Sequence, residues 1–350
     1  MTRPNRVLRR WGAAVAALGG AAAAVFGVRF LSFEPEPVMA LKPSGEQGRM
    51  LEPGEVFTVL NWNLQYAGSR KHNFFYDGGP AVHVPPDDVV KTIQQIQAVL
   101  EAVDADLVLL QEVDRASWRT SNLDQLEVLR DSARWPVWVS TPYHRSGYVP
   151  HPSGNHLGKV DMHLAVLSRF ALRSVVRIDL PRLDESWVRQ VFNLKRALLA
   201  LEVPVVGEAP LRLGNTHLSA FSQGDGTLGR QVGVLRDWMA RSERVLLAGD
   251  FNALPPGDDR TRLPDDGHHY ADETEPLEAL AASFSEVSGS SILSSDWYTY
   301  LPFGADAPDR KIDHIFYGKE IEVLEARVLS EYSDISDHLP IWVKARVRTP

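Results

Sequence analysis

Short apolar runs that end in polar side chains constrain the fold of this chain more than any other feature. From about residue 57 onward these runs alternate with helical and loop segments. Such alternation is typical of an α/β fold in which helices cover buried sheets. No short-period repeat is present, which argues against a solenoid or a propeller. The predicted strands are Phe57–Asn61, Asp106–Leu110, Leu164–Leu167, Ala197–Val203, Leu211–Asn215, Val245–Ala248, Lys311–Tyr317 and Pro340–Val347.

Two helices are predicted between these strands. The first begins near Asp87 and Asp88, whose carboxylates complement the positive end of a helix dipole. The second spans Thr227 to Arg241. Apolar residues spaced three or four apart give the first helix one buried face. They are Val89, Ile93, Ile96, Val99, Leu100 and Val103.

The composition excludes several classes of protein. Hydrophobic residues make up 44% of the 350 residues and charged residues 23%, which excludes a largely disordered chain. The absence of cysteine excludes zinc ribbons, iron–sulfur clusters and a thiol nucleophile. The net charge of −8 argues against a domain that coats nucleic acid with a basic surface. The negative net charge does not exclude a nuclease that binds one phosphate through a cation.

The first 33 residues have the pattern of a membrane anchor or signal. Four of the first ten residues are arginines, and an uncharged 18-residue segment, Trp11–Val28, follows. As a helix this segment would be about 27 Å long, just short of the hydrocarbon core of a bilayer. The basic flank predicts that the chain after it is exported and extracytoplasmic. A cleaved signal peptide is the alternative to an uncleaved anchor, although no small-x-small cleavage site follows the apolar run.

Two further segments follow the predicted anchor. Residues 34–54 are rich in proline and glycine and are predicted to form a linker. Residues 55–350 are predicted to form a single catalytic domain.

Polar side chains recur where the predicted strands end. In an α/β fold such ends converge on one site at the edge of a rigid sheet. Carboxylates are hard ligands that suit Mg²⁺, amides can orient phosphate, and imidazoles can move protons. Each residue alone would be structural, since an Asp after a Gly usually forms a turn, but their combination favours function. The groups are Leu60-Asn61-Trp62-Asn63, Leu109-Leu110-Gln111-Glu112, Gly214-Asn215-Thr216-His217, Leu247-Ala248-Gly249-Asp250-Phe251-Asn252, Lys311-Ile312-Asp313-His314 and Ser336-Asp337-His338.

The order of these motifs resembles the endonuclease/exonuclease/phosphatase superfamily, the DNase I-like proteins, over about residues 56–347. The resemblance implies a four-layer α/β sandwich with two face-to-face mixed sheets flanked by helices. It also implies a Mg²⁺-dependent hydrolase of phosphate esters, with Mn²⁺ possible because oxygen ligands do not distinguish the two ions. The matching motifs are Asn61-Trp62-Asn63-Leu64-Gln65, Gln111-Glu112-Val113, Thr216-His217-Leu218, Gly249-Asp250-Phe251-Asn252, Ile312-Asp313-His314-Ile315 and Ser336-Asp337-His338-Leu339-Pro340.

The resemblance further implies roles for single residues at the metal. Glu112 would be the principal metal ligand, and Asn63 and Asp337 would complete the metal site.

The catalytic roles carry over in the same way. Asp250 would orient or deprotonate the attacking water, and Asn252 would hold the phosphate. His338, oriented by Asp313, would stabilise or protonate the phosphoryl centre. Asp250 and His338 remain alternatives for the general base. His217 would be a second acid/base or phosphate-binding group.

One segment departs from the pattern of the superfamily, Lys159–Phe170. The Leu-Ser-Arg-Phe sequence at the end of this segment matches the superfamily pattern. Asp161 falls near the acid that pairs with the first histidine in DNase I-like members, so it is expected either to orient His217 or to be merely solvated. His163 is expected either to contact substrate or to line the pocket structurally.

Two other segments allow more than one interpretation. The acidic stretch Asp258–Glu275 contains His268-His269, but adjacent histidines on an extended chain point in opposite directions and chelate poorly. A solvated loop over the site is expected there. Phe74-Phe75-Tyr76 could stack on a base or enter a bilayer, although core packing is the commoner fate of such a cluster.

Three functions remain open at this stage. The predicted anchor and the net negative charge of the chain favour a membrane-tethered phosphodiesterase or phosphatase that acts on a lipid headgroup or another extracytoplasmic phosphate. A secreted or tethered nuclease that acts on DNA or RNA is the alternative. A catalytically inactive binding module is less favoured, because Glu112, Asp250, Asn252, Asp313 and His338 are all present. No protein partner is implied.

Overall fold

The structure is a computed structural model that describes residues 19–20, 27, 32–45, 48–130, 134–220, 224–263, 270 and 275–349. Most of the predicted anchor, residues 1–33, and the His268-His269 pair lie outside these described residues. Among the helices that the structure does describe, none has the length and apolarity needed to span a bilayer.

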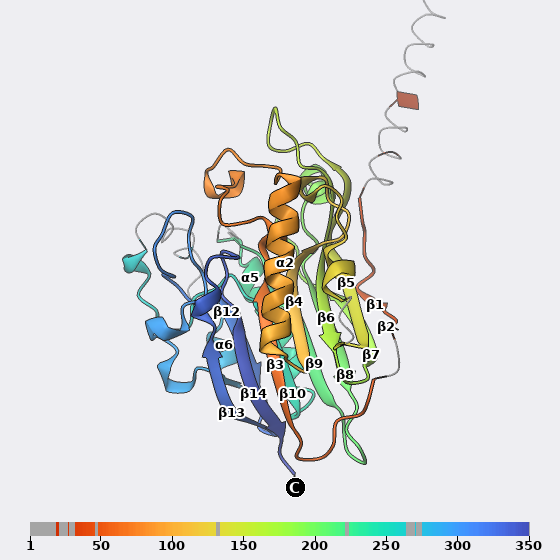
Figure 1. Cartoon of the computed structure of the whole chain (residues 1–350), viewed down its shortest axis with the longest axis vertical. Coiled ribbons are helices and arrows are strands. Elements are labelled where there is room, and N and C mark those ends of the chain that lie inside the picture. Colours follow the sequence, from red (N-terminus) through yellow and green to blue (C-terminus); the bar gives the residue numbers. More distant parts are fainter. Residues whose placement is uncertain are drawn as a thin grey trace, which may run out of the picture.

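Two mixed sheets of seven strands each pack face to face at the centre of the fold (Figure 1). The first sheet has the order β13 (Ile321–Val328), β14 (Ile341–Val347), β3 (Val56–Asn63), β4 (Leu107–Asp114), β6 (Gly158–Ser168), β5 (Val137–Val149) and β2 (Ser44–Gly45). The second has the order β1 (Val38–Ala40), β7 (Arg173–Asp179), β8 (Ala197–Val203), β9 (Leu211–His217), β10 (Val245–Asp250), β12 (Asp313–Tyr317) and β11 (Ser285–Glu286).

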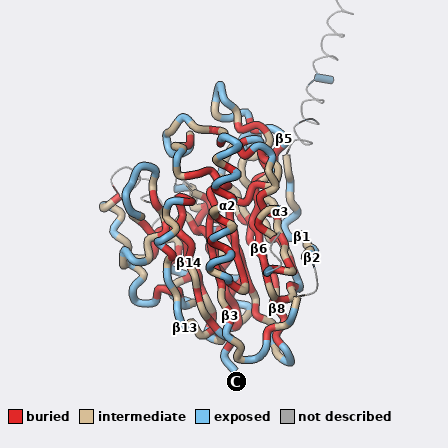
Figure 2. The backbone as a smooth tube through the Cα atoms, viewed as in Figure 1, coloured by how far each residue is buried: buried red, intermediate tan, exposed pale blue. Residues whose placement is uncertain are grey.

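The strands are apolar on both faces, because each sheet is covered on both sides. Val59 and Leu109 belong to the core between the sheets, whereas Leu60 and Val108 belong to a second core under the helices. Figure 2 shows the resulting buried centre beneath an exposed helix surface. The predicted four-layer α/β sandwich is confirmed, with few helices in the outer layers.

The two predicted helices are the main covering elements. α2 (Pro86–Val103) and the short α3 (Gln125–Leu129) pack on the first sheet, and α5 (Thr227–Met239) and α6 (Glu278–Ala281) pack on the second. One more helix, α4 (Trp187–Phe192), precedes β8. Short 3₁₀ turns are η1 (Gln65–Ala67), η2 (Phe75–Asp77), η3 (Trp118–Thr120), η4 (Arg260–Arg262), η6 (Gly289–Ser291), η7 (Ser295–Trp297) and η8 (Ser330–Tyr332).

The segment 34–54, predicted to be a linker, instead runs along one side of the sandwich. β1 pairs with β7 of the second sheet and β2 pairs with β5 of the first. Leu51 forms a bridge with Val205 and is fully buried in the core between the sheets. The prolines and glycines that suggested a linker are compatible with short edge strands, where few ladder hydrogen bonds are required.

All eight predicted strands exist, and their registers explain why the polar groups meet. β3 and β4 are parallel, with Asn63 opposite Gln111, and β9 and β10 are parallel, with His217 opposite Asp250. β12 is antiparallel to β10 and starts at Asp313, directly opposite Asp250. Carboxyl ends of parallel strands and amino ends of antiparallel ones therefore lie at one edge of the sandwich.

Candidate active site

A β-bulge aims Glu112 into a cleft at this edge. The register of β4 against β6 shifts between Leu110 and Val113, and Glu112 within this bulge has a positive φ of 54°. Bulges of this kind re-aim a side chain, and a left-handed backbone at a non-glycine residue is typical of functional sites. The Asn63 amide Nδ2 lies 3.4 Å from the Glu112 carboxylate.

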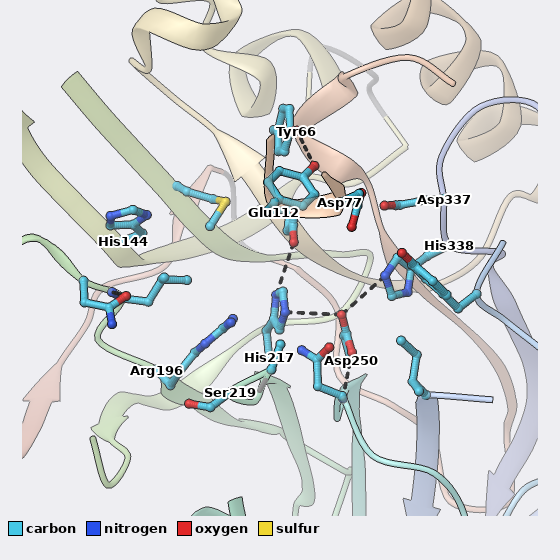
Figure 3. A pocket seen from close by; sticks show the side chains of 18 of the residues that line it. Tyr66, Asp77, Glu112, His144, Arg196, His217, Ser219, Asp250, Asp337 and His338 are labelled. Atoms are coloured by element: carbon cyan, nitrogen blue, oxygen red, sulfur yellow. Dashed lines mark hydrogen bonds and ion pairs between the residues drawn. The ribbon is translucent and has the colours of Figure 1, made fainter. Parts of the chain in front are cut away.

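Asp250 is the centre of the polar cluster (Figure 3). Its Oδ2 accepts a hydrogen bond from Asn63 Nδ2 at 2.9 Å and lies 3.2 Å from His217 Nε2 and 3.6 Å from His338 Nε2. Its Oδ1 accepts from the backbone N–H of Asn252 at 2.9 Å. The preceding Gly249 is required, because a Cβ there would lie 2.0 Å from the carbonyl oxygen of Thr216. Asp250 therefore joins groups from both sheets.

His338 is held by Asp313 as an imidazolium. Its Nδ1 donates to Asp313 Oδ2 at 2.7 Å, and its Nε2 faces Asp250. Burial alone would lower the pKa of His338, but the two carboxylates raise that pKa well above its ordinary value. Ligand atoms of Asp250, Asp313 and His338 lie within 4.8 Å of one another, as a metal site would require. Because His338 Nδ1 is already bonded to Asp313, we interpret the trio as a proton-transfer group.

His217 is the neutral histidine of the site. Burial, followed by the nearby charges of Arg196 and His338, lowers the pKa of His217 well below its ordinary value. Burial raises the pKa of Asp250 to about 7. With Asp250 ionised, His217 Nε2, 3.2 Å from Asp250 Oδ2, carries the proton and Nδ1 is an acceptor. The hydroxyl of Tyr143, 3.1 Å from Nδ1, is the matching donor.

The sequence of the chain matches the model of the Endonuclease/Exonuclease/phosphatase family over residues 60–338. The chain belongs to this family. Its enzymes hydrolyse phosphate esters with a divalent metal, and that is the class of activity to which the chain is assigned. No curated protein matches the chain in a sequence search.

Solved structures of endonuclease/exonuclease/phosphatase proteins show the same fold. One is such a protein from Beutenbergia cavernae DSM 12333, with a TM-score of 0.59 and 21% identity, covering 84% of this chain and 72% of that one. The human Nocturnin catalytic domain with bound sulfate anion has a TM-score of 0.53 and 16% identity over 87% and 96%. ANGEL2, described as a 2′,3′-cyclic phosphatase and bound to adenosine-2′,3′-vanadate, has a TM-score of 0.52 and 17% identity over 89% and 100%.

The acidic end of the cleft has the ligands that a divalent metal of this family requires. Glu112, Asp337 and Asp77 line this end together. Burial, with added repulsion from Glu112 and Asp77, raises the pKa of Asp337 to about 7. In the described part of the chain, neither Glu112 nor Asp337 has a Lys or Arg partner within 4 Å. Carboxylates that lack a direct Lys or Arg partner are hard oxygen ligands that fit Mg²⁺ or Mn²⁺.

Asn63 turns its amide nitrogen, rather than its oxygen, toward the two carboxylates Glu112 and Asp250. Its Oδ1 accepts from the backbone N–H of Gln65 at 3.0 Å, and its Nδ2 donates to Asp250. Asn252, expected to hold phosphate, lines the same cleft and donates from Nδ2 to the carbonyl of Leu218 at 3.0 Å.

The role expected for Asp161 as a partner of His217 is wrong. Asp161 accepts from Arg145 at 2.6 Å and contacts His163 Nε2 at 2.9 Å. Asp161 and His163 are two residues apart on β6, so they share the face of the strand that meets Arg145 on β5. Neither residue lines the cleft, so His163, which is 2% exposed, neither contacts a ligand there nor lines the pocket, and both roles expected for it are wrong.

The cleft itself has a volume of about 750 Å³. Phe75 and Tyr76 line it, whereas Phe74 is buried against Tyr66 with ring centroids 5.2 Å apart. The aromatic cluster thus combines core packing with cleft lining. Sequence reasoning missed Tyr143 and also Arg196, which lines the cleft just before β8. The one available signal was that Arg196 is a charged residue next to the five consecutive apolar residues that begin β8, Ala197–Leu201.

Proposed function

We propose that the protein is a membrane-tethered, Mg²⁺-dependent phosphodiesterase or phosphatase that acts on an extracytoplasmic phosphate ester, with a lipid headgroup as the favoured substrate. The observation that carries the hydrolase part is the arrangement around Asp250 Oδ2, with Asn63, His217 and His338 nitrogens 2.9, 3.2 and 3.6 Å away. A carboxylate so placed can orient and activate a water molecule for attack on phosphorus.

In the proposed reaction each residue of the site has a separate role. Glu112 and Asp337 would hold the metal, which when bound would neutralise charge on the phosphoryl oxygens. Asn63 would hold Asp250 through its amide nitrogen. Asp250 positions the water, and the Asn252 amide contacts the phosphate. In this proposal Asp250, rather than His338, activates the water.

His338 has the complementary role of a proton donor. As an imidazolium fixed by Asp313, it carries a proton on Nε2 that can pass to the leaving oxygen or stabilise the phosphoryl charge. The neutral His217 donates from Nε2 toward Asp250 and so keeps that carboxylate oriented.

The membrane part of the proposal is supported by the place where the N-terminal segment joins the domain. Glu34 lies 2.9 Å from Arg182, and Arg182 lines the cleft. α4 lies next to this point and exposes Trp187 by 66% and Val188 by 48%. An exposed Trp next to an exposed Val is suited to a lipid interface. A tether that precedes residue 34 would therefore place the cleft near the bilayer.

A substrate screen tests the proposal. The full-length chain in detergent, with Mg²⁺ or Mn²⁺, is assayed against sphingomyelin, phosphoinositides, plasmid DNA and RNA. Hydrolysis of a lipid headgroup is expected. Rapid cutting of nucleic acid with inert lipids would identify the nuclease alternative, and no hydrolysis by a folded, metal-loaded chain would favour an inactive binding module.

A variant pair tests the membrane contact. Trp187→Ser should lower the hydrolysis of vesicle lipids and leave that of bis(4-nitrophenyl) phosphate unchanged. Leu324→Ser is the control, because Leu324 is 43% exposed on β13 at the opposite edge of the first sheet from β2. Equal vesicle activity in both variants would contradict the proposed contact.

A further inference from the structure

Arg196 is a cleft arginine without an acidic partner. Its Nη1 atom is buried and has no hydrogen-bond partner, and the side chain as a whole is partly accessible from the cleft. No carboxylate pairs with it among the described residues. Two other arginines of the cleft lining differ in this respect. Arg119 pairs with Asp114 at 2.8 Å, and Arg182 with Glu34 at 2.9 Å.

An unpaired guanidinium in such a place indicates an anionic ligand. Arginine stays charged under all ordinary conditions, and a buried charge without partners costs several kcal/mol. Burial lowers the pKa of Arg196, whereas for Arg119 the effect of burial is outweighed by Asp114, which raises the pKa. The planar N–H groups of arginine match the oxygens of phosphate or carboxylate.

The position of Arg196 separates it from the reacting phosphate. His217 and Arg196 both contact the Tyr143 ring, at centroid distances of 5.4 Å and 5.5 Å. Tyr143 bonds to Nδ1 of His217, while Nε2 on the other side of the imidazole faces Asp250. In Figure 3, Arg196 lies on one side of His217, and Asp250 and His338 lie on the other.

A second donor is available at this end of the cleft. Ser219 lines the cleft, and its Oγ accepts from Gln231 Nε2 at 2.9 Å, which leaves its own hydroxyl hydrogen free to donate. The carboxylate of Glu185 also lines the cleft, but it accepts from Asn193 Nδ2 at 2.7 Å. The metal end therefore holds Glu112, Asp337 and Asp77, whereas this end holds the donors Arg196 and Ser219 together with one carboxylate, Glu185.

We propose that Arg196 binds a second anionic group of the substrate, a phosphate or carboxylate next to the phosphoester that is hydrolysed. The inference rests on the proposed function, which places the reacting phosphate next to Asp250. It narrows the substrate class to phosphate esters that carry a second anionic group. A phosphorylated lipid headgroup and the neighbouring phosphate of a nucleotide share this chemistry.

Binding of two ligand pairs tests the proposal and distinguishes these sources. The pairs are inositol 1-phosphate with inositol 1,4-bisphosphate, and thymidine 5′-monophosphate with thymidine 3′,5′-bisphosphate. Calorimetry of the full-length chain at fixed Mg²⁺ should show that the bisphosphate of one pair binds about 10- to 100-fold more tightly. Arg196→Gln should abolish that preference, and Arg196→Lys should retain part of it. Arg182→Gln is the control, because Arg182 lines the same cleft with its charge already paired.

Two results would overturn the inference. One is a wild-type chain without preference in either pair. The other is an Arg196→Gln variant that is folded by circular dichroism and binds both members of a pair equally less tightly, because Arg196 would then hold the reacting phosphate. A wild-type chain that shows the Arg196-dependent preference but hydrolyses neither phosphodiesters nor phosphomonoesters with Mg²⁺ would refute the proposed function and leave the subsite intact.

Discussion

Replacing Tyr143 with phenylalanine tests whether His217 works as a neutral imidazole with a fixed proton position. Burial, with Arg196 and His338, lowers the pKa of His217, so one ring nitrogen lacks a proton at neutral pH. The Asp250 carboxylate, 3.2 Å from Nε2, requires that the proton sit on Nε2. Nδ1 then depends on the Tyr143 hydroxyl, 3.1 Å away, as its hydrogen-bond donor.

The magnitude follows from the loss of that one donor. Tyr143 is fully buried, so phenylalanine keeps the packing and removes only the hydroxyl. A buried acceptor left without a partner costs about 1–3 kcal/mol. Moving the proton to Nδ1 would give no relief, because a lone pair on Nε2 would then face Asp250. If the whole cost reaches the transition state, turnover falls about 5- to 150-fold at 1.36 kcal/mol per tenfold change.

The assay is steady-state hydrolysis of bis(4-nitrophenyl) phosphate at saturating Mg²⁺, combined with ¹⁵N NMR of histidine to identify the protonated nitrogen of His217. Tyr148→Phe is a matched control, because its hydroxyl also contacts a histidine nitrogen, Nδ1 of His156 at 2.6 Å, outside the cleft lining. Unchanged turnover in Tyr143→Phe, together with an unchanged ¹⁵N spectrum of His217, would refute the reasoning.

Four further perturbations have defined outcomes. Asp250→Ala should lower turnover at least about 100-fold, and wild-type turnover in this variant would remove Asp250 from the mechanism. EDTA should abolish hydrolysis and Mg²⁺ or Mn²⁺ should restore it, whereas activity that persists in EDTA would contradict a metal-dependent reaction. Leu51→Ala should lower the free energy of unfolding by about 2–5 kcal/mol in urea titrations, and no change would show that residues 34–54 are dispensable for the domain. Burial lowers the pKa of His144 to about 3, so below pH 6.5 the unfolded chain takes up a proton that the folded chain does not. As the pH falls from 6 to 4, the unfolding free energy of the wild type should therefore decrease by about 1.4 kcal/mol per pH unit more than that of His144→Gln. Equal slopes in the two proteins would contradict this.

The strands that carry the site could be predicted because they are buried on both faces. β8 was predicted with its observed bounds, Ala197–Val203, because it is apolar at every position except Glu202 and lies between two cores. β5 was missed because Pro142, Arg145 and other polar residues interrupt its apolar residues and its register against β6 shifts twice. An irregular strand with bulges does not show a regular period of two in its sequence.

The partners of the site residues were harder to predict than the residues themselves. Asp161 was close enough in motif order to suggest a pair with His217, but strand register points it at Arg145. Tyr143, which does contact His217, comes from the strand that sequence reasoning missed. Motif order therefore indicates which residues meet, whereas hydrogen-bond partners depend on register and bulges that local sequence does not encode.

The site depends on both sheets being held at a fixed spacing. Gln111 Nε2 on β4 donates to Asn61 Oδ1 at 2.9 Å and across the sandwich to Asn215 Oδ1 at 2.7 Å. Asn215 Nδ2 returns a hydrogen bond to the carbonyl of Leu110 at 3.0 Å. These buried amides lie one or two residues from Asn63, Glu112 and His217 along their strands, so they fix the catalytic groups of one sheet against those of the other. A sandwich without these amides could keep its apolar core, yet it would not hold Asn63 within 2.9 Å of Asp250.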